Sequence, residues 1–363
     1  MNVTELLRDS MKTKPASNRG ARKKTSTSKD VVRMNYNENN YGMSDKVKQV
    51  IIDAALGSYM YQDFYAVDLK EKLAGLYGLT KDHILVGSGS SAVIDMLGEV
   101  FINYGDEVVY CMPSYEAFPD MVSDNGGVRV PVPLDKDYKF DLDGMFAAIT
   151  DKTKMAIVVN PNNPTGTYVN AAAVEMFVRR LPEHVIAVVD EAYFEYVDDD
   201  THYSLIRMIQ EGYDRPLIVL RTFSKIYGLA GLRIGYAVGD PLLIDELMKA
   251  CQAWNVGRNA QMAAMAALDD QDYIKEMKAL NIANRSYVSG ELKKLGCDVV
   301  EPAANFIYFD AHRDSQAVRN KLAESKIMIG APDAFNRVSV GTREQNEAFI
   351  AAMRMVMEEL PVR

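Results

Sequence analysis

Seven short apolar runs, separated in several places by stretches with helical spacing, predict a mixed α/β fold. Three of these runs, Met155–Val159, Val185–Val189 and Leu217–Leu220, lack polar alternation, which is typical of strands buried on both faces of a parallel sheet. We therefore expect a large domain built on a mainly parallel, seven-stranded sheet. The other expected strands are Ile84–Val86, Val108–Cys111, Val128–Val132 and Ile234–Val238.

Apolar residues at helical spacing mark the expected helices. Between residues 45 and 56 they fall at positions 47, 50, 51, 54 and 55, which lie on one face of a helix. After Pro241 the pattern changes to helices and a few short strands, so a smaller second unit is expected there. A length of 363 residues is typical of about two domains. The expected helices include Asp45–Leu56, Val67–Tyr77, Ala92–Phe101 and Leu242–Ala253.

Composition narrows the class of protein. No apolar run approaches the roughly 18–20 residues needed to span a bilayer, and the N-terminus lacks an apolar signal-peptide core. The three cysteines, Cys111, Cys251 and Cys297, are widely spaced, so neither a disulfide framework nor a metal site is expected. The expectation is a cytoplasmic enzyme that uses no metal and does not bind a membrane.

Charge is distributed unevenly along the chain. Residues 1–33 hold nine Lys and Arg against three Asp and Glu, a net charge of +6, which leaves −15 for the remainder of a chain whose total is −9. A basic arm can bind nucleic acid. We favour a mobile or dimer-wrapping extension, because nothing else in the chain resembles a nucleic-acid module and the acidic body would repel phosphates.

Polar groups follow three of the buried strands, at the point where each strand ends. The first strand is followed by Asn160–Gly166, the second by Asp190 and the third by Thr222–Lys225. Ligands bind outside the carboxyl ends of the strands in such sheets. We therefore expect these polar groups to form one site.

Lys225 has the surroundings of a residue that forms an imine with a phosphate-bearing aldehyde. Thr222 and Ser224 flank it with hydroxyl groups, and Arg233 follows eight residues later. The usual protein partners of pyridoxal 5′-phosphate are such a lysine and an acid for its pyridine nitrogen, and Asp190 can supply the acid. The expected cofactor is therefore pyridoxal 5′-phosphate.

A glycine-rich turn adds an expected anion site. Gly87–Ser91 follows one predicted strand and opens a predicted helix. Unpaired backbone N–H groups at a helix start, together with the helix dipole, hold an anion. Glycine also lets the backbone approach a phosphate closely.

These motifs resemble those of the class I/II aminotransferases of fold type I, and within that group those of the histidinol-phosphate aminotransferases. The resemblance runs from Asn35–Asn39 to Arg337–Arg343, and so covers nearly everything after about residue 30. It implies a large domain over residues 45–245 that binds the cofactor and a small α/β domain over residues 246–363. Residues 1–44 are expected to join the small domain as an N-terminal arm.

The resemblance implies a role for each candidate cofactor residue. Tyr115 would stack on the cofactor ring, and Asn163 and Tyr193 would hydrogen-bond its phenolic oxygen. Asp190 would keep the ring nitrogen protonated, because a buried opposite charge favours the cation. Tyr61 would reach the phosphate of the neighbouring subunit, so a homodimer is expected. The residues implied for the phosphate are Ser90, Ser91, Thr222, Ser224 and Arg233.

Lys225 is expected to act twice, as the point of covalent attachment and, once released, as the base that moves the α-proton. The implied reaction is a ping-pong transamination between a small-molecule amine and a 2-oxo acid. One alternative is a lyase on the same scaffold, such as a threonine-phosphate decarboxylase. Another is a cofactor-binding protein or regulator without turnover, against which the intact set of Lys225, Asp190 and Arg233 argues.

The donor pocket is less specific than the cofactor site. Arg337 is the candidate for the donor's anionic group, because a guanidinium binds a carboxylate or a phosphate through two parallel hydrogen bonds. Asn305 and Tyr41 are expected to line the same pocket. Histidinol-phosphate aminotransferases usually carry a second arginine where this chain has Gly330. The missing charge weakens the case for a dianionic phosphate, so histidinol phosphate and an aromatic amino acid both stay open as donors.

Overall fold

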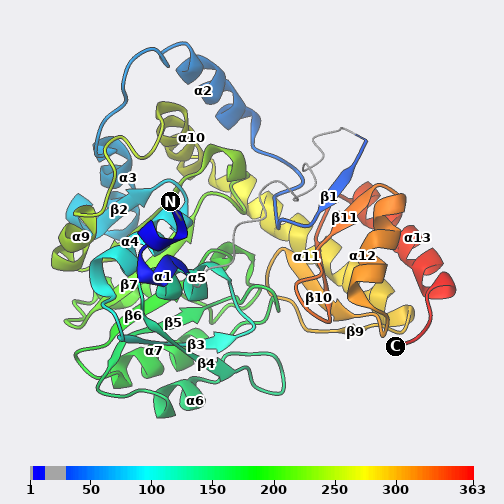
Figure 1. The fold of residues 1–363 in the computed structure, drawn as a ribbon. Coiled ribbons are helices and arrows are strands. Elements are labelled where there is room, and N and C mark those ends of the chain that lie inside the picture. Colours follow the sequence, from blue (N-terminus) through cyan, green and yellow to red (C-terminus); the bar gives the residue numbers. More distant parts are fainter. Residues whose placement is uncertain (1–2, 13–29) are drawn as a thin grey trace.

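The largest element of the protein is a seven-stranded sheet, seen in a computed structural model that describes residues 3–12 and 30–363 (Figure 1). The strand order is β2-β8-β7-β6-β5-β3-β4, and within this sheet only β8 runs antiparallel to its neighbours. The predicted mainly parallel sheet is therefore confirmed. Its strands are β2 Ile84–Gly87, β3 Glu107–Met112, β4 Val128–Pro133, β5 Thr153–Val159, β6 Ile186–Asp190, β7 Leu217–Thr222 and β8 Gly235–Gly239.

Helices connect most of the strands and pack on the sheet, as α4 does on β2, β7 and β8. The α-helices are α1 Asp9–Lys12, α2 Asp45–Ala55, α3 Val67–Tyr77, α4 Ser90–Phe101, α5 Ala117–Asp124, α6 Leu142–Ala147, α7 Ala171–Arg180, α8 Ile206–Gln210, α9 Pro241–Met248, α10 Arg258–Leu268, α11 Gln271–Lys294, α12 Ser315–Glu324 and α13 Arg343–Glu359. Short 3₁₀ turns span Val3–Leu6, Lys81–His83, Phe194–Tyr196 and Ala230–Leu232. In the described part of the chain, no helix is long and apolar enough to cross a membrane.

Position in the sheet explains the composition of its strands. Every residue of β6 and β7 is buried, as their unbroken apolar sequences predict. The edge strand β4 is mostly exposed and contains Pro131 and Pro133, which lack the N–H that an inner strand must donate. The apolar runs therefore identify the inner strands that carry the polar groups of the predicted site.

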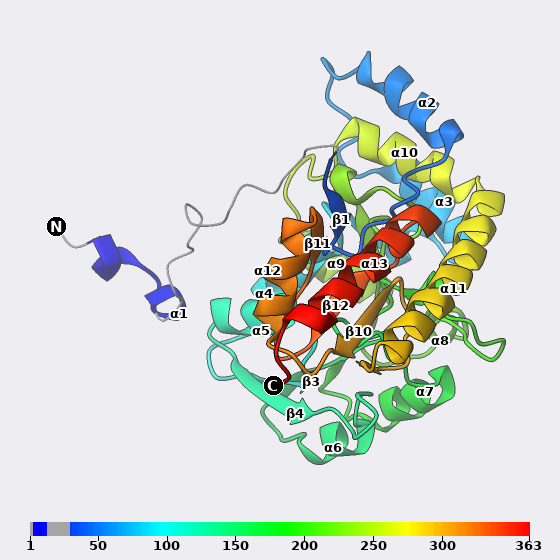
Figure 2. The ribbon, with the colours of Figure 1, turned by 90° about the vertical axis from the view of Figure 1, so that its right-hand side faces the viewer.

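A second unit is built from the C-terminal part of the chain and one N-terminal strand. Strand β1 (Val32–Met34) pairs in parallel with β11 (Ile327–Ile329), as Figures 1 and 2 show. A separate antiparallel sheet has the order β12-β10-β9. The remaining strands are β9 Asp298–Val299, β10 Phe306–Asp310 and β12 Asn336–Ser339. The N-terminal segment thus contributes directly to this unit.

Two hydrophobic clusters mark the two units. The larger surrounds the seven-stranded sheet and includes Met277 of α11, whereas Val288 of the same helix belongs to the smaller cluster, together with Met34 of β1. The two cores therefore meet along α11. A domain division at residues 44 and 245 stays a prediction.

The N-terminal arm is described only in part. In the short helix α1, the Ser10 hydroxyl donates to the main-chain oxygen of Asp124 at the end of α5, 2.8 Å away. Most of the basic residues of the predicted extension fall within residues 13–29, outside the described part of the chain. Its role in wrapping a dimer stays a prediction.

Several element boundaries differ from the prediction. Helix α9 ends at Met248 rather than at residue 253, and Asn255 beyond it donates to the main-chain oxygen of Val86, a tertiary contact that periodicity does not encode. Helix α4 begins at Ser90, two residues earlier than expected. Strand β8 begins at Gly235, because Arg233 takes a left-handed conformation with φ of 53°.

A buried ion-pair triad joins the ends of β6 and β7. Arg221 is 6% exposed, and it lies 2.9 Å from the carboxylate of Glu191 and 3.0 Å from that of Glu195. Its guanidinium also stacks on the ring of Phe194, with its carbon 4.1 Å from the ring centroid. Removing the cation would leave the carboxylates of Glu191 and Glu195 without an ion-pair partner, which is far more costly than losing an exposed ion pair.

We expect Arg221→Ala to lower the free energy of unfolding by about 3–5 kcal/mol. The matched control is Arg207→Ala, because Arg207 pairs with Glu211 at 2.6 Å and stacks on Tyr203, but with more than half of its side chain exposed. That substitution should cost about 1 kcal/mol or less. Urea denaturation followed by circular dichroism measures both. Similar losses for the two variants would contradict a stabilising role for the buried triad.

Candidate active site

The carboxyl ends of β5, β6 and β7 open into one cavity of about 600 Å³. This is where ligands bind in sheets of this kind. Polar residues from the strand ends, from the start of α4 and from β12 meet there. The sequence-predicted residues on its wall are Ser90, Ser91, Tyr115, Asn163, Asp190, Tyr193, Thr222, Ser224, Lys225, Arg233 and Arg337.

Lys225 projects its amine into this cavity just beyond the end of β7. The Nζ atom donates to the main-chain oxygen of Tyr36 at 3.4 Å and lies 5.3 Å from the centre of the Tyr193 ring. The described residues place no carboxylate in ion-pair contact with it. The amine is therefore held by weak contacts and can change partners.

Asp190 is the last residue of β6 and is only 2% exposed. Burial raises the pKa of its carboxyl to about 6, although a hydrogen bond from the Ala192 main-chain N–H, 3.0 Å away, and the charge of Lys225 both act in the opposite direction. A buried carboxylate is costly without a cation beside it. The site is thus suited to a ligand that carries a protonated nitrogen.

Arg233 lies against the first turn of α4. Its guanidinium donates to the Ala230 main-chain oxygen at 3.1 Å and to the Ser224 hydroxyl at 3.5 Å, and within the described chain it forms no ion pair. Gly89 precedes the helix with φ of +80°, and a Cβ there would lie 2.3 Å from the guanidinium. Only glycine lets this cation approach the unpaired N–H groups of Ser90 and Ser91, so the corner is suited to an anion.

Arg337, from β12, forms the opposite side of the cavity. It donates to the side-chain oxygen of Asn163 and to the main-chain oxygen of Asn35, the latter at 2.9 Å. Its Nε is buried without a hydrogen-bond partner, and burial lowers the pKa of the guanidinium below its usual range. No carboxylate in the described residues pairs with it, so this cation is available to an anionic ligand group.

Two aromatic hydroxyls complete the cavity wall. The hydroxyl groups of Tyr115 and Ser91 lie 3.4 Å apart, and burial raises the pKa of Tyr115. The Tyr193 hydroxyl accepts a hydrogen bond from the Asn37 side chain at 3.0 Å. Asn37 is buried and takes a left-handed φ of 56°.

The structure also brings in residues that the sequence did not identify. The wall includes Tyr36, Asn37, Glu38, Met112, Pro113, Ser114, Glu116, Val159, Pro164, Ala192, Ala230, Pro332 and Asp333. The Asn35–Asn39 motif was the available signal for the first three, since a run of polar residues beside a strand indicates a binding loop. The last two come from a loop that carries no recognisable motif.

Three predicted residues do not lie on the cavity wall. Asn305 is buried behind it, where its side chain donates to the main-chain oxygens of Asn37 and Glu38 at 3.1 and 3.3 Å. The Tyr41 hydroxyl accepts from Asn284 at 2.8 Å, and the residue lines a neighbouring cavity of about 410 Å³. Neither residue lines the cavity, and a role for Asn305 or Tyr41 in the donor pocket stays a prediction.

Tyr61 lies outside this chain's cavity. Its side chain is 79% exposed and stacks on Trp254, with ring centres 4.7 Å apart. Leu56, Tyr59, Met60 and Tyr65 are also exposed on the same segment. This position leaves Tyr61 free to contact a second molecule.

The charges in the cavity fit a cofactor with a phosphate, a protonated ring nitrogen and a reactive aldehyde. Arg233 and the start of α4 offer an unfilled anion site, Asp190 a buried carboxylate and Lys225 an amine. None of the three charged side chains is matched by an ion pair in residues 3–12 and 30–363. Ligand groups of opposite charge would relieve the cost of burying Asp190 and would use the unpaired donors of Arg233.

Comparisons with known proteins agree with this geometry. The family description "Aminotransferase class I and II" matches residues 29–353. A histidinol-phosphate aminotransferase from Moorella thermoacetica is 37% identical over 334 residues, covering 91% of this chain and 86% of the relative. Histidinol-phosphate aminotransferase 2 from Carboxydothermus hydrogenoformans is also 37% identical over 334 residues, covering 89% and 90% of the two chains.

A solved structure matches over a similar range. The histidinol-phosphate aminotransferase from Sinorhizobium meliloti, crystallised in complex with pyridoxal 5′-phosphate, aligns with a TM-score of 0.85 at 30% identity. The alignment covers 90% of this chain and 91% of that one. The expected fold type I architecture is confirmed. The fold, the charges in the cavity and the family match over residues 29–353 agree. This protein therefore belongs to the class I and II aminotransferases.

Proposed function

We propose that this cavity binds pyridoxal 5′-phosphate and transfers an amino group from an amine donor to a 2-oxo acid. The observation that carries the proposal is the convergence of Lys225, Asp190, Arg233 and Arg337 on one cavity, each without an ion-pair partner in the described chain. When bound, the cofactor supplies an aldehyde that links covalently to an amine and a ring that accepts the electrons of the donor's α-carbon.

Each part of the cofactor has a matching group on the cavity wall. Arg233, the first N–H groups of α4 and the hydroxyls of Thr222 and Ser224 would hold the phosphate. Asp190 would hold the protonated ring nitrogen, and Tyr115 would cover a face of the ring. Asn163 and Tyr193 would donate hydrogen bonds to the phenolic oxygen of the cofactor.

Lys225 is the residue of this chain that takes part directly in the proposed reaction. Its Nζ is the nucleophile that holds the cofactor and, when a donor amine takes its place, the free amine that removes the α-proton of the donor. The same Nζ would then pass this proton to the C4′ carbon of the cofactor. Amine donor and 2-oxo acid bind in turn, which gives ping-pong kinetics.

Arg337 is proposed to bind the anionic group of the donor. Its buried position and unpaired Nε favour a planar, two-oxygen anion such as a carboxylate. The two relatives named above are histidinol-phosphate aminotransferases. Gly330 beside Arg337 provides no second cation, so an aromatic amino acid is proposed as a donor at least as good as histidinol phosphate.

The active unit is proposed to be a homodimer. Tyr61 and its exposed apolar neighbours lie outside the cavity of their own chain, where they are suited to pack on a second copy and to reach its phosphate site. A cytoplasmic location, in which Cys111, Cys251 and Cys297 stay reduced, is part of the same proposal.

Lys225→Ala should bind the cofactor without a covalent bond and should be almost inactive, because the only proposed base is removed. In the wild-type enzyme, borohydride reduction should attach the cofactor to the peptide that contains Lys225. Peptide mapping by mass spectrometry measures this. Attachment to a different lysine would refute the assignment.

Asp190→Asn should retain the cofactor but lose most of the turnover, at least about a hundredfold in kcat, because the ring nitrogen loses its negative partner. Steady-state kinetics at saturating cofactor measures the loss. Near-normal turnover would mean that Asp190 has only a structural role.

The same substitution should stabilise the enzyme that lacks cofactor. The pKa of Asp190 is raised to about 6 in the fold, from an ordinary 3.8, so ionising it costs stability as the pH rises from about 4 through 6. At pH 7.5 the Asn variant should be more stable by about 3 kcal/mol, and at pH 4 by much less. Denaturation at the two pH values tests this, and an equal difference at both would exclude burial of the charge as the cause.

Hybrid dimers test the shared site. Mixing inactive Lys225→Ala with a severely impaired Tyr61→Ala variant should restore part of the activity, because one of the two hybrid sites combines two intact contributions. Subunit exchange is verified with differently tagged chains. Absence of recovery despite exchange would count against a contribution from Tyr61.

Gly330→Arg tests the donor. The main chain of Gly330 pairs with that of Arg337, and a Cβ at Gly330 would make only ordinary contacts, 3.4 Å from the Arg337 main-chain oxygen and 3.6 Å from its Nη2, so a side chain can begin there without a clash. We expect the ratio of kcat/KM for histidinol phosphate over phenylalanine to rise by about ten- to a hundredfold. Gly330→Met is the uncharged control. A wild-type preference of a hundredfold for the phosphate ester would contradict our interpretation of Gly330.

A further inference from the structure

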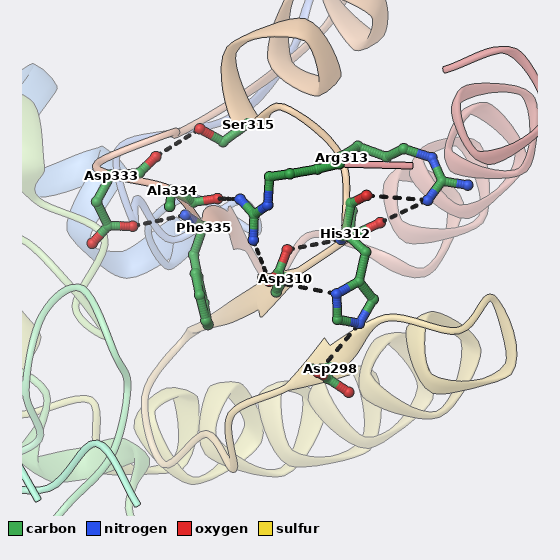
Figure 3. A network of polar contacts seen from close by, with 10 residues as sticks. Asp298, Asp310, His312, Arg313, Ser315, Asp333, Ala334 and Phe335 are labelled. Atoms are coloured by element: carbon green, nitrogen blue, oxygen red, sulfur yellow. Dashed lines mark hydrogen bonds and ion pairs between the residues drawn. The ribbon is translucent and has the colours of Figure 1, made fainter. Parts of the chain in front are cut away.

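The loop between β11 and β12 brings a carboxylate to the donor side of the cavity. Pro332 and Asp333 of this loop lie on the cavity wall, as does Arg337 on the strand that follows. Asp333 belongs to a network of polar contacts that joins the loop to β10 and α12, and Figure 3 shows its contacts with Ser315 and Phe335.

Three hydrogen bonds fix Asp333 in place. One carboxylate oxygen accepts from the Tyr308 hydroxyl at 2.6 Å, and the other accepts from the Phe335 main-chain N–H at 2.8 Å. The main-chain oxygen of Asp333 accepts from the Ser315 hydroxyl at 2.6 Å (Figure 3). The charge of an exposed loop is thereby held at one position instead of being spread over many rotamers.

Tyr308 links this carboxylate to the proposed anion site. It lies on β10 directly opposite Arg337 of β12, and directly opposed residues project from the same face of a sheet. Burial and the neighbouring Asp333 raise the pKa of the Tyr308 hydroxyl, so it stays protonated and donates a hydrogen bond to the carboxylate. Tyr308 therefore contacts the Asp333 carboxylate with its hydroxyl and is paired with Arg337 through the strands.

The C-terminal residue fixes the loop from its other side. The Arg363 guanidinium donates to the main-chain oxygen of Ala334 at 3.0 Å and to the Asp310 carboxylate at 2.6 Å. The main-chain N–H of Arg363 donates to the His312 main-chain oxygen at 2.9 Å. The main chain of Ala334, which follows Asp333, is therefore tied through Arg363 to β10 and to the segment that follows it.

The charge of Asp333 is not balanced within the described cavity. The cations on the wall are Lys225, Arg233 and Arg337, and none of them forms an ion pair with it. The proposed function assigns each of these cations to the cofactor or to the donor's anionic group. A fixed negative charge therefore faces the space left for the rest of the donor.

We propose that Asp333 selects the donor side chain by charge, favouring groups that are cationic or donate hydrogen bonds and disfavouring anionic groups. This inference rests on the proposed function, in which Arg337 binds the donor carboxylate. Like charges held close together are repelled and opposite charges attracted, and both effects act on the same bound donor.

The test uses two donors of similar shape and opposite charge, 4-(aminomethyl)phenylalanine and 4-carboxyphenylalanine. The wild-type holoenzyme should show a kcat/KM at least about tenfold higher for the cationic donor at low ionic strength. Asp333→Asn should lower this ratio by about tenfold, because the asparagine keeps the shape and loses the charge. Added salt should lower the wild-type ratio and leave that of the variant almost constant.

Two further variants distinguish the effect of a charge held at one position from the effect of the net charge of the cavity wall. Glu116→Gln removes an equal charge from the same cavity wall at an exposed residue, and should change the ratio less than Asp333→Asn does. Tyr308→Phe keeps the charge but removes its hydrogen-bond donor, and should lower the ratio part of the way. Absorbance of the bound cofactor and thermal unfolding confirm that each variant is folded.

Two results would overturn the inference: an unchanged ratio in Asp333→Asn, or an equal effect of Glu116→Gln. Failure of the proposed function looks different, because then neither donor nor phenylalanine would be turned over by the wild-type enzyme, whatever residue occupies position 333.

Discussion

The buried ion pairs of Arg221 with Glu191 and Glu195 are the interaction on which the rest of the site depends. Glu191 directly follows Asp190, and Arg221 directly precedes Thr222, so the pairs join the two strand ends that carry the acid and the lysine loop. Because these charges are buried, displacing Arg221 would leave both carboxylates without a cation. The distance between the end of β6 and the end of β7 is therefore strongly constrained, and so are the positions of the groups beyond them.

The cavity itself shows the opposite arrangement, since Lys225, Asp190, Arg233 and Arg337 on its wall form no ion pair with a described residue. Asp190 is buried and ionises only at a cost, and Arg337 keeps an unpaired Nε in the interior. Such groups reduce the stability of a protein without ligand and increase the affinity for ligands of complementary charge. A paired triad behind the strand ends and unpaired charges in front of them are consistent with a rigid support for a site that is completed by its cofactor and donor.

The inner strands and the polar groups at their ends could be predicted, because burial on both faces leaves an unbroken apolar run and the parallel arrangement places all the ends at one edge. The parts of the fold and of the site that could not be predicted depend on tertiary contacts. The pairing of β1 with β11 joins residues almost 300 positions apart, and Asp333 is held at the cavity wall by hydrogen bonds to Tyr308, Phe335 and Ser315. Asn305 and Tyr41 were expected on the wall for their motif, but they bond to main chain and side chains behind it. No local pattern encodes such contacts.

The central claim is that this chain moves an amino group and does not cleave a carbon–carbon bond. The most direct measurement is a single turnover of the wild-type holoenzyme with an amine donor and no 2-oxo acid, followed by absorbance and product analysis. The account expects the aldehyde band of the cofactor to disappear as one equivalent of oxo product forms per site, and to return when a 2-oxo acid is added. Release of carbon dioxide with the aldehyde band retained would contradict it.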